Sequence, residues 1–402
     1  MRTSFIILLL WLGLPLAAQD LIRGRLRNEK GEALANASVY IPQTSRGTVS
    51  AADGSFTLTG LPAGNFQLAV SSVGYETLVS TITQAQRAGF LDIRLREKQS
   101  ALNEVVVRRP EKDGWAKWGK TFMDAFVGNS DYATQCRLLN KEKLQFVWQK
   151  ENELLQVYSE EPLLLENHAL GYALRIDLDY FELHTGTGVV DFRFYPLFSP
   201  LQGTEDEIVT WKANRETAYR YSLAYFLRLL AAGRFESKYH VRKLVIRENT
   251  EKARVNQLVR VKGGLRNLPK DSTAYYEQVL RQPDRETEQF PDPVDASQLV
   301  QRSGTSSLIN FPDYLLVQFR RKPAPAAYTR FLEKQEETAM NNRKGTVQFT
   351  SRGTPYSEMR MEDNEPIEVS EDGFFLYNNL YVSGFWGWWE KLATRLPMEY
   401  RP

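Results

Sequence analysis

Few residues of this 402-residue sequence have the types and spacing that catalysis requires. The chain has three histidines, His168, His184 and His240, and a single cysteine, Cys136. Zinc is held by histidine, cysteine and carboxylate side chains, but none of the histidines has a glutamate three positions later. We therefore expect no metal and no cofactor; the alternative is a three-histidine site assembled in space. One thiol cannot form an internal disulfide, and we expect Cys136 to be a small buried residue.

Acidic residues alternate along one strand-like segment, where Asp177, Asp179 and Glu182 precede His184. Such a set could supply a general acid and a general base on one face. We favour the other interpretation, the solvated side of an antiparallel strand. The sequence has no Gly-x-Ser-x-Gly elbow and no phosphate-binding glycine loop, which disfavours serine hydrolases and nucleotide enzymes. A glycosidase with two scattered carboxylates stays open.

The segment Gly384–Trp389 (GFWGWW) places three tryptophans within four residues. Because tryptophan is seldom fully buried, some indole is expected near the surface. Trp386, Trp388 and Trp389 are therefore our candidate surface for a protein or glycan partner, since tryptophan anchors protein interfaces and offers a flat face to sugars. The other interpretation is that this run caps the core of the second domain.

The first part of the chain has short segments in which apolar and polar residues alternate, as they do in β-strands. Asp53-Gly54 indicates a tight turn, and glycine, proline or asparagine breaks most of the intervals between strands over residues 22–96. This pattern predicts a β-sandwich. Its expected inward residues are Ile22, Gly24, Leu26, Ala37, Val39, Ile41, Phe56, Leu58, Phe66, Leu68, Val70, Leu78, Ile82, Leu91, Ile93 and Leu95.

Four short motifs in this region carry a family resemblance: GEAL at 31–34, DGSF at 53–56, LPAGNF at 61–66 and VGY at 73–75. Together they resemble the carboxypeptidase-like regulatory domain. The resemblance implies a seven-stranded, transthyretin-like sandwich of the kind that opens many Bacteroidota envelope proteins. It concerns a domain appended to some carboxypeptidases and not their catalytic domain. Residues 161–172 and 384–400 are similar to the bodies of uncharacterised Bacteroidota proteins that carry this module, which implies no activity.

The N-terminus is typical of a signal peptide. Arg2 precedes the apolar run Phe5–Leu12, and Ala18 ends a plausible cleavage site, so we expect export to the periplasm or outer membrane. No later stretch is apolar enough for a transmembrane helix. The nearly balanced charge, 51 basic against 49 acidic residues, argues against nucleic acid as a partner. The predicted layout is a signal peptide at 1–18, the sandwich at 19–97, a linker at 98–114 and an α+β domain at 115–402.

Within the linker, Leu102–Val107 (LNEVVV) resembles the segment that joins this module to TonB-dependent transporters. That segment can pair with the sheet edge of a partner. We favour a last strand or stiff connector, because the residues that remain are too few for a transporter barrel.

Periodicity predicts the helices and strands of the second domain. With the sandwich, they make the predicted fold class mainly β / α+β: a β-sandwich followed by an α+β domain with one long helix. That helix spans 204–232, opened by a capping box of Thr204 and Glu207 and ended by Gly233. Residues 263–306 are polar and proline-rich, which indicates a loop. The other predicted elements are a helix at 115–127 and strands at 143–148, 153–159, 172–181, 189–195, 314–319 and 346–350.

The function that these patterns favour is that of an exported, non-enzymatic envelope protein. It would bind an envelope protein or a glycan through its sandwich and its second domain. The alternative is a carbohydrate-binding or carbohydrate-processing protein.

Overall fold

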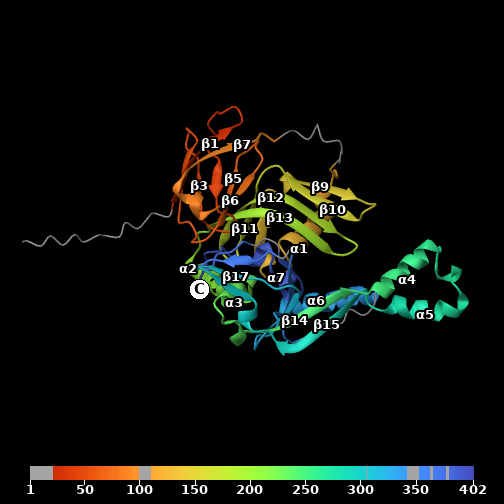
Figure 1. Cartoon of the computed structure of the whole chain (residues 1–402). Coiled ribbons are helices and arrows are strands. Elements are labelled where there is room, and N and C mark those ends of the chain that lie inside the picture. Colours follow the sequence, from red (N-terminus) through yellow and green to blue (C-terminus); the bar gives the residue numbers. More distant parts are fainter. Residues whose placement is uncertain (1–20, 99–109, 305, 342–352, 363–364, 377–379) are drawn as a thin grey trace, which may run out of the picture.

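A computed structural model describes residues 21–98, 110–304, 306–341, 353–362, 365–376 and 380–402. The predicted signal peptide, the segment Leu102–Val107 and the strand predicted at 346–350 lie outside these ranges. Figure 1 shows three parts along the chain: a β-sandwich, an α+β body beside it, and a narrow arm that projects from the body on the side away from the sandwich.

The first part is a sandwich of seven strands, as the sequence predicted. Three strands form one sheet in the order β4-β1-β7, and four form the other in the order β3-β2-β5-β6. The strands are β1 (Leu21–Asn28), β2 (Ser38–Tyr40), β3 (Gly47–Val49), β4 (Ser55–Thr59), β5 (Phe66–Ser71), β6 (Leu78–Ile82) and β7 (Phe90–Leu95).

Alternation along these strands builds the sandwich core, in which Ile22, Val39 and Phe56 are at most 5% exposed. Gly24 lies where β1 and β7 approach closely, and a Cβ there would come within 2.3 Å of a backbone oxygen of β7. The prediction for Leu78 is wrong, since its side chain is 39% exposed. It lies on β6, the outermost strand of its sheet, where one neighbouring strand is missing.

The body begins with helix α1 (Gly114–Phe126), which packs on a six-stranded antiparallel sheet. Phe122 of the helix contacts Phe181 of the sheet with ring centroids 5.0 Å apart. The helix and the four predicted strands are confirmed, whereas β8 and β11 are short and were not predicted. The strands are β8 (Cys136–Leu138), β9 (Leu144–Gln149), β10 (Leu154–Ser159), β11 (Leu163–Asn167), β12 (Tyr172–His184) and β13 (Val189–Pro200).

The single helix predicted over residues 204–232 is instead two helices, α2 (Glu205–Tyr221) and α3 (Leu223–Ala231). Ser222 between them is extended, with ψ of 151°, and its hydroxyl accepts a hydrogen bond from the amide of Tyr225. A serine N-cap starts the second helix at a new angle, which apolar spacing alone does not reveal. The Thr204–Glu207 capping box is present.

Two smaller sheets complete the body, ordered β15-β14-β18-β19-β21 and β16-β17-β20. The predicted strand at 314–319 is confirmed as β18. Helices α6 (Ala326–Asn341) and α7 (Gly384–Trp389) lie against this part (Figure 1). The strands are β14 (Tyr239–Glu248), β15 (Arg285–Pro293), β16 (Val300–Ser303), β17 (Ser306–Ile309), β18 (Tyr314–Phe319), β19 (Tyr356–Met361), β20 (Ile367–Val369) and β21 (Leu380–Val382).

Most of the predicted loop at 263–306 is instead regular structure, and part of it forms the arm (residues 245–288). The ends of β14 and β15 pair as a two-stranded ribbon, which carries a hairpin of α4 (Thr250–Val261) and α5 (Lys270–Arg281). Among the described side chains of the hairpin, only Val255, Leu268 and Val279 are buried. So sparse an apolar pattern explains why the sequence indicated a loop.

The sandwich and the body share hydrogen bonds between backbone groups. The turn after β2 lies between β13 and the C-terminal segment: Gln43 donates to the carbonyl of Pro196 at 2.7 Å and accepts from Met398 at 2.7 Å. Thr44 accepts from Phe198 at 2.9 Å. Tyr40, on the outer face of β2, is fully buried beneath the body. The outer face of this sandwich sheet is therefore an internal surface of the protein.

Candidate functional site

Asp177, the first of the alternating acidic residues, lies in a buried network between sandwich and body. Its carboxylate accepts hydrogen bonds of 2.6 Å from the Tyr40 hydroxyl, the Ser71 hydroxyl and an Arg175 Nη atom. Burial and the adjacent Asp177 carboxylate raise the pKa of Tyr40 well above its ordinary value, so its hydroxyl stays a donor. All three partners donate to the carboxyl oxygens of Asp177, so this residue joins the sandwich to the body and is not free to act as a general base.

The other alternating residues lie apart from Asp177. Asp179 pairs with the exposed Arg193 at 3.4 Å, and Glu182 accepts a hydrogen bond from Gln156. Along a strand that rises about 3.3 Å per residue, Asp177 and His184 are roughly 23 Å apart. Asp177 is buried among three hydrogen-bond donors, whereas Asp179 pairs with Arg193 at the surface. The structure therefore does not bring this set together as an acid–base pair.

The histidines and the cysteine also lie in separate environments. His168 pairs with Glu166 at 2.9 Å, and His240 is in β14, on another sheet from His184. Within the described ranges, no three histidine, cysteine or acidic side chains are grouped so that they could hold a metal ion. Cys136 is half-buried, and burial raises the pKa of its thiol to about 12.

The three candidate tryptophans are buried, with exposures of 0% for Trp386, 6% for Trp388 and 4% for Trp389. Trp386 packs on Phe226 and donates its indole N–H to the carbonyl of Tyr221 at 3.0 Å. The expectation of an open tryptophan surface is thus wrong, because the run folds as the short helix α7 inside the aromatic core. Trp386 belongs to that core alone.

Trp388 and Trp389 line a cavity of about 220 Å³. The cavity lies where the loop after α1, the end of α2, the start of α6 and helix α7 meet. This volume is below the roughly 300–1,000 Å³ of pockets for drug-sized ligands, so it suits one small ligand group. The lining residues are Ser130, Asp131, Tyr132, Thr217, Tyr221, Pro325, Ala327, Trp388 and Trp389.

Aromatic rings form one wall of this cavity and hold one another in place. The Trp389 ring centroid is 5.4 Å from that of Tyr221 and 6.1 Å from that of Tyr132. The indole N–H of Trp388 donates to Asn129 at 2.6 Å, and the Tyr221 hydroxyl donates to the carbonyl of Pro323 at 3.0 Å. The wall is therefore prearranged, which reduces the entropic cost of binding.

Two polar atoms of the lining residues have no hydrogen-bond partner among the described residues: the Ser130 hydroxyl and the Trp389 indole N–H. Both residues are more than nine-tenths buried. Leaving such a group unpaired costs about 1–3 kcal/mol, and unpaired buried groups are rare in native proteins. Neither atom is exposed to solvent, and both belong to residues that line the cavity.

Charged side chains surround the cavity. Asp131 forms an exposed ion pair with Arg330 at 2.7 Å. The Lys322 ammonium lies 3.3 Å from the centroid of the Tyr221 ring. Burial, followed by the nearby charges of Arg220 and Lys238, lowers the pKa of Lys322 to about 7. The cavity thus has an aromatic wall, one carboxylate at its lining and a lysine in contact with one of its rings.

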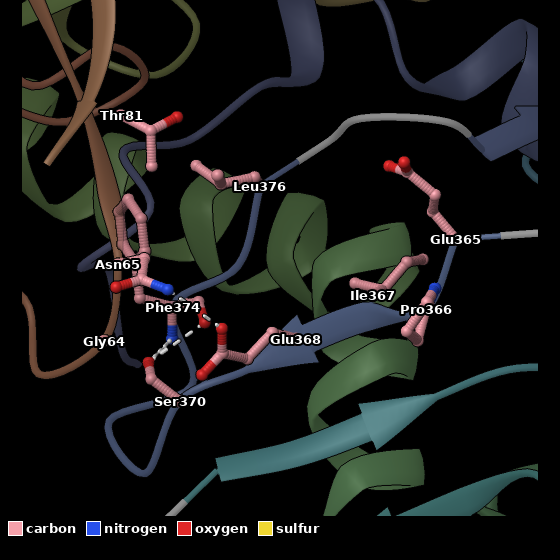
Figure 2. A pocket seen from close by; sticks show the side chains of 10 residues that line it. All are labelled: Gly64, Asn65, Thr81, Glu365, Pro366, Ile367, Glu368, Ser370, Phe374 and Leu376. Atoms are coloured by element: carbon pink, nitrogen blue, oxygen red, sulfur yellow. Dashed lines mark hydrogen bonds between the residues drawn. The ribbon is translucent and has the colours of Figure 1, made fainter. Parts of the chain in front are cut away.

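A second hollow of about 200 Å³ lies at the seam between sandwich and body. Figure 2 shows Gly64 and Asn65 of the sandwich facing Glu368, Ser370 and Phe374 of the body. Asn65 donates to Glu368 at 3.4 Å across the seam, and the Phe374 amide donates to the Ser370 hydroxyl at 3.0 Å within the body. Because these polar groups already have partners, this hollow is a weaker candidate than the aromatic cavity.

Sequence reasoning found Trp388 and Trp389 but missed Ser130, Tyr132 and Tyr221. The missed residues come from segments that are 85 or more positions apart from one another or from α7, and none belongs to a motif. No signal in one sequence could have grouped them, because they meet only where the loop after α1, the end of α2 and helix α7 come together.

Fold and cavity define a two-part protein, a transthyretin-like sandwich joined to a larger α+β body with an aromatic cavity. Residues 22–107 match the CarboxypepD_reg-like domain family, so the first part is a CarboxypepD_reg-like domain. This is the regulatory-like module and not a catalytic carboxypeptidase domain. A search of curated proteins found no match to the chain.

Two solved structures are similar to parts or most of the chain. A cohesin–X-dockerin complex from Acetivibrio cellulolyticus is 16% identical over 18% of this chain, with a TM-score of 0.15. The match spans about half, 51%, of that structure's chain. A Bacteroides fragilis protein of unknown function with a proposed membrane association is 8% identical over 90% of this chain and 94% of its own, with a TM-score of 0.16. TM-scores this low carry no information on fold or function.

Proposed function

We propose that this protein is an exported, non-enzymatic binding protein of the cell envelope. In this proposal the body holds a ligand group in the aromatic cavity, and the CarboxypepD_reg-like domain is a fixed accessory domain. The observation that carries the proposal is the pair of unpartnered polar atoms, Ser130 Oγ and Trp389 Nε1, beside prearranged rings in one cavity. Protein groups of this kind gain most from a ligand that supplies the missing hydrogen-bond partners.

The scattering of titratable residues supports binding over catalysis. Asp177 is committed to three hydrogen bonds, Asp179 pairs with Arg193, and Glu182 accepts a hydrogen bond from Gln156. The export step rests on the N-terminal pattern of Arg2 and Phe5–Leu12. Mass spectrometry of protein from the envelope fraction should find a chain that starts at Gln19.

A glycan ligand is a second candidate, favoured by the chemistry of the cavity. A sugar ring presents an apolar face that would pack on Trp388 or Tyr132, and hydroxyl groups that would pair with Ser130, Asp131 and Trp389. A protein partner would instead insert one side chain. A glycan ligand would give a signal on a glycan array, whereas a protein partner would be recovered as a crosslinked envelope protein.

The test compares variants of the cavity that keep the fold. Ser130→Ala removes an unpaired hydroxyl and should leave the melting temperature nearly unchanged. Trp389→Phe retains a ring and removes the unpaired N–H, but it should lower the melting temperature because the smaller ring leaves a void among buried side chains. Both should reduce the glycan-array signal or the crosslinked partner. Ser303→Ala, on an exposed strand residue far from the cavity, is the matched control and should behave as wild type. Undiminished glycan and partner signals in both cavity variants would reject the proposal.

A further inference from the structure

Basic residues gather in one part of the arm (residues 245–288), although the arm as a whole has nine basic and seven acidic residues. Residues 250–270 contain six basic residues and one acidic residue, a net charge of +5, whereas the whole chain has a net charge of +2. The basic residues are Lys252, Arg254, Arg260, Lys262, Arg266 and Lys270.

The positive charge that is not neutralised lies at the distal end of the arm. Near the ribbon, Lys252 pairs with Asp284 at 2.8 Å, and Arg254 pairs with Glu251 at 2.7 Å. The tip, residues 260–266, contains Arg260, Lys262 and Arg266, all exposed, and none of the three pairs with an acidic group in the described part of the chain. The tip therefore presents three cations to solvent.

An apolar side chain lies among these cations. Val261, between Arg260 and Lys262, is 74% exposed, and it ends helix α4 just before the turn at Gly263 and Gly264. These glycines have φ of 74° and 130°, a backbone that other residues adopt rarely. The turn thus fixes the basic side chains and the valine at one convex end.

The tip also lies far from the rest of the molecule. Helix α4 has 12 residues, which at 1.5 Å per residue gives a length of about 18 Å beyond the ribbon. Figure 1 shows the α4–α5 hairpin projecting clear of the body, on the side away from the sandwich. A flat surface could therefore touch the tip without collision with the sheets.

We propose that the tip of the arm docks on an anionic phospholipid surface. Arg260, Lys262 and Arg266 would face the phosphate groups, and Val261 would enter the boundary between headgroups and acyl chains. Basic residues combined with an exposed apolar side chain are typical of contacts with a lipid interface. A single-stranded nucleic acid would need aromatic stacking platforms, and the tip has no aromatic residue.

The test is flotation of the full-length chain with vesicles of phosphatidylcholine alone or of phosphatidylcholine and phosphatidylglycerol in equal parts. Wild type should float with the anionic vesicles only, and binding should weaken as added salt shortens the Debye length from about 10 Å toward 3 Å. Each basic residue near an anionic surface contributes about fivefold. The triple change Arg260→Glu, Lys262→Glu and Arg266→Glu should therefore reduce binding at least about tenfold.

A control with the same change of net charge isolates the position of the charge. Arg94, Lys150 and Lys212 are exposed, lie in the sandwich and the body, and form no ion pair in the part of the chain that the structure describes. Changing these three to Glu should leave at least half of the binding. Val261→Ser, which keeps the charge, should reduce binding without a change in its salt dependence.

If the triple variant unfolds, the hairpin can be removed instead. Because Glu248 and Arg285 are paired in the ribbon, residues 249–284 can be replaced by an Asn-Gly turn that suits a two-residue hairpin. Loss of vesicle binding in this variant supports the proposal. The proposal is overturned if the wild-type protein binds neither kind of vesicle or binds both equally. It is also overturned if binding persists when the charges of the three basic tip residues are reversed. Binding of the tip to heparin or to an acidic protein, but not to the vesicles, also overturns it.

Discussion

Replacing Asp177 by alanine should weaken both the fold and the connection between its two parts. The carboxylate accepts hydrogen bonds from Tyr40, Ser71 and Arg175, each of 2.6 Å, and is 7% exposed. Removing one partner of a fully buried ion pair costs about 3–5 kcal/mol. Here the side chain of Arg175 is 24% exposed, and the Tyr40 hydroxyl keeps a second acceptor, the carbonyl of Tyr195, at 3.1 Å. We therefore expect the free energy of unfolding to fall by about 2–4 kcal/mol.

Urea denaturation measures this change with two probes. Every tryptophan among the described residues lies in the body, so tryptophan fluorescence reports the body, whereas far-ultraviolet circular dichroism reports both parts. In wild type the two transitions should coincide. In Asp177→Ala the circular dichroism transition should begin at lower urea, because the sandwich separates first.

Asp179→Ala is the matched control on the same strand. Asp179 pairs with Arg193 at 3.4 Å, and both side chains are about half exposed. Exposed pairs contribute about 0–1 kcal/mol, so the control should change the free energy of unfolding by less than about 0.5 kcal/mol. Combining Asp177→Ala with Tyr40→Phe should cost less than the sum of the two by about 1 kcal/mol or more, since they share one hydrogen bond. An Asp177→Ala protein no less stable than Asp179→Ala would refute the reasoning.

Three further predictions concern single residues. We expect the isolated span 19–100 to unfold cooperatively, and a noncooperative melt of the wild-type span would contradict this. In that span, Phe56→Ala should lower the free energy of unfolding by about 3–5 kcal/mol, because Phe56 is 5% exposed in the sandwich core. Burial raises the pKa of the Cys136 thiol to about 12. Ellman's reagent at pH 8 should therefore label this thiol at least about a hundredfold more slowly in the native protein than in the unfolded chain. Equal labelling rates would contradict the burial. Lys322 has a pKa near 7 when folded and about 10.4 when unfolded, so the unfolded chain binds more protons between these values and stability should rise with pH across that range. Lys322→Met should flatten this rise and raise the melting temperature at pH 6; an unchanged pH profile would rule out the role of Lys322.

The sequence alone determined the features that depend on neighbours along the chain. Alternation and the Asp53-Gly54 turn predicted six of the seven strands of the sandwich, and the motifs at 31–75 identified the family, whose resemblance implied seven. The spacing of Thr204 and Glu207 predicted where α2 begins, because a capping box is a local device. The break at Ser222 was missed, since a serine that caps a helix and a serine within one look alike in an apolar pattern.

Tertiary structure alone decided what the side chains do. Asp177 has the same sequence context as Asp179, yet one is buried against Tyr40 and the other faces solvent. The bulge in β12 between Leu178 and Tyr180 shifts the alternation, and the sandwich then covers only one side. Trp386 and Trp388 are two residues apart, but the turn of α7 places the first in the core and the second at a cavity whose other walls come from distant segments. Contacts between distant segments depend on how whole sheets and helices pack on one another. That packing cannot be predicted from the pattern of neighbouring residues alone.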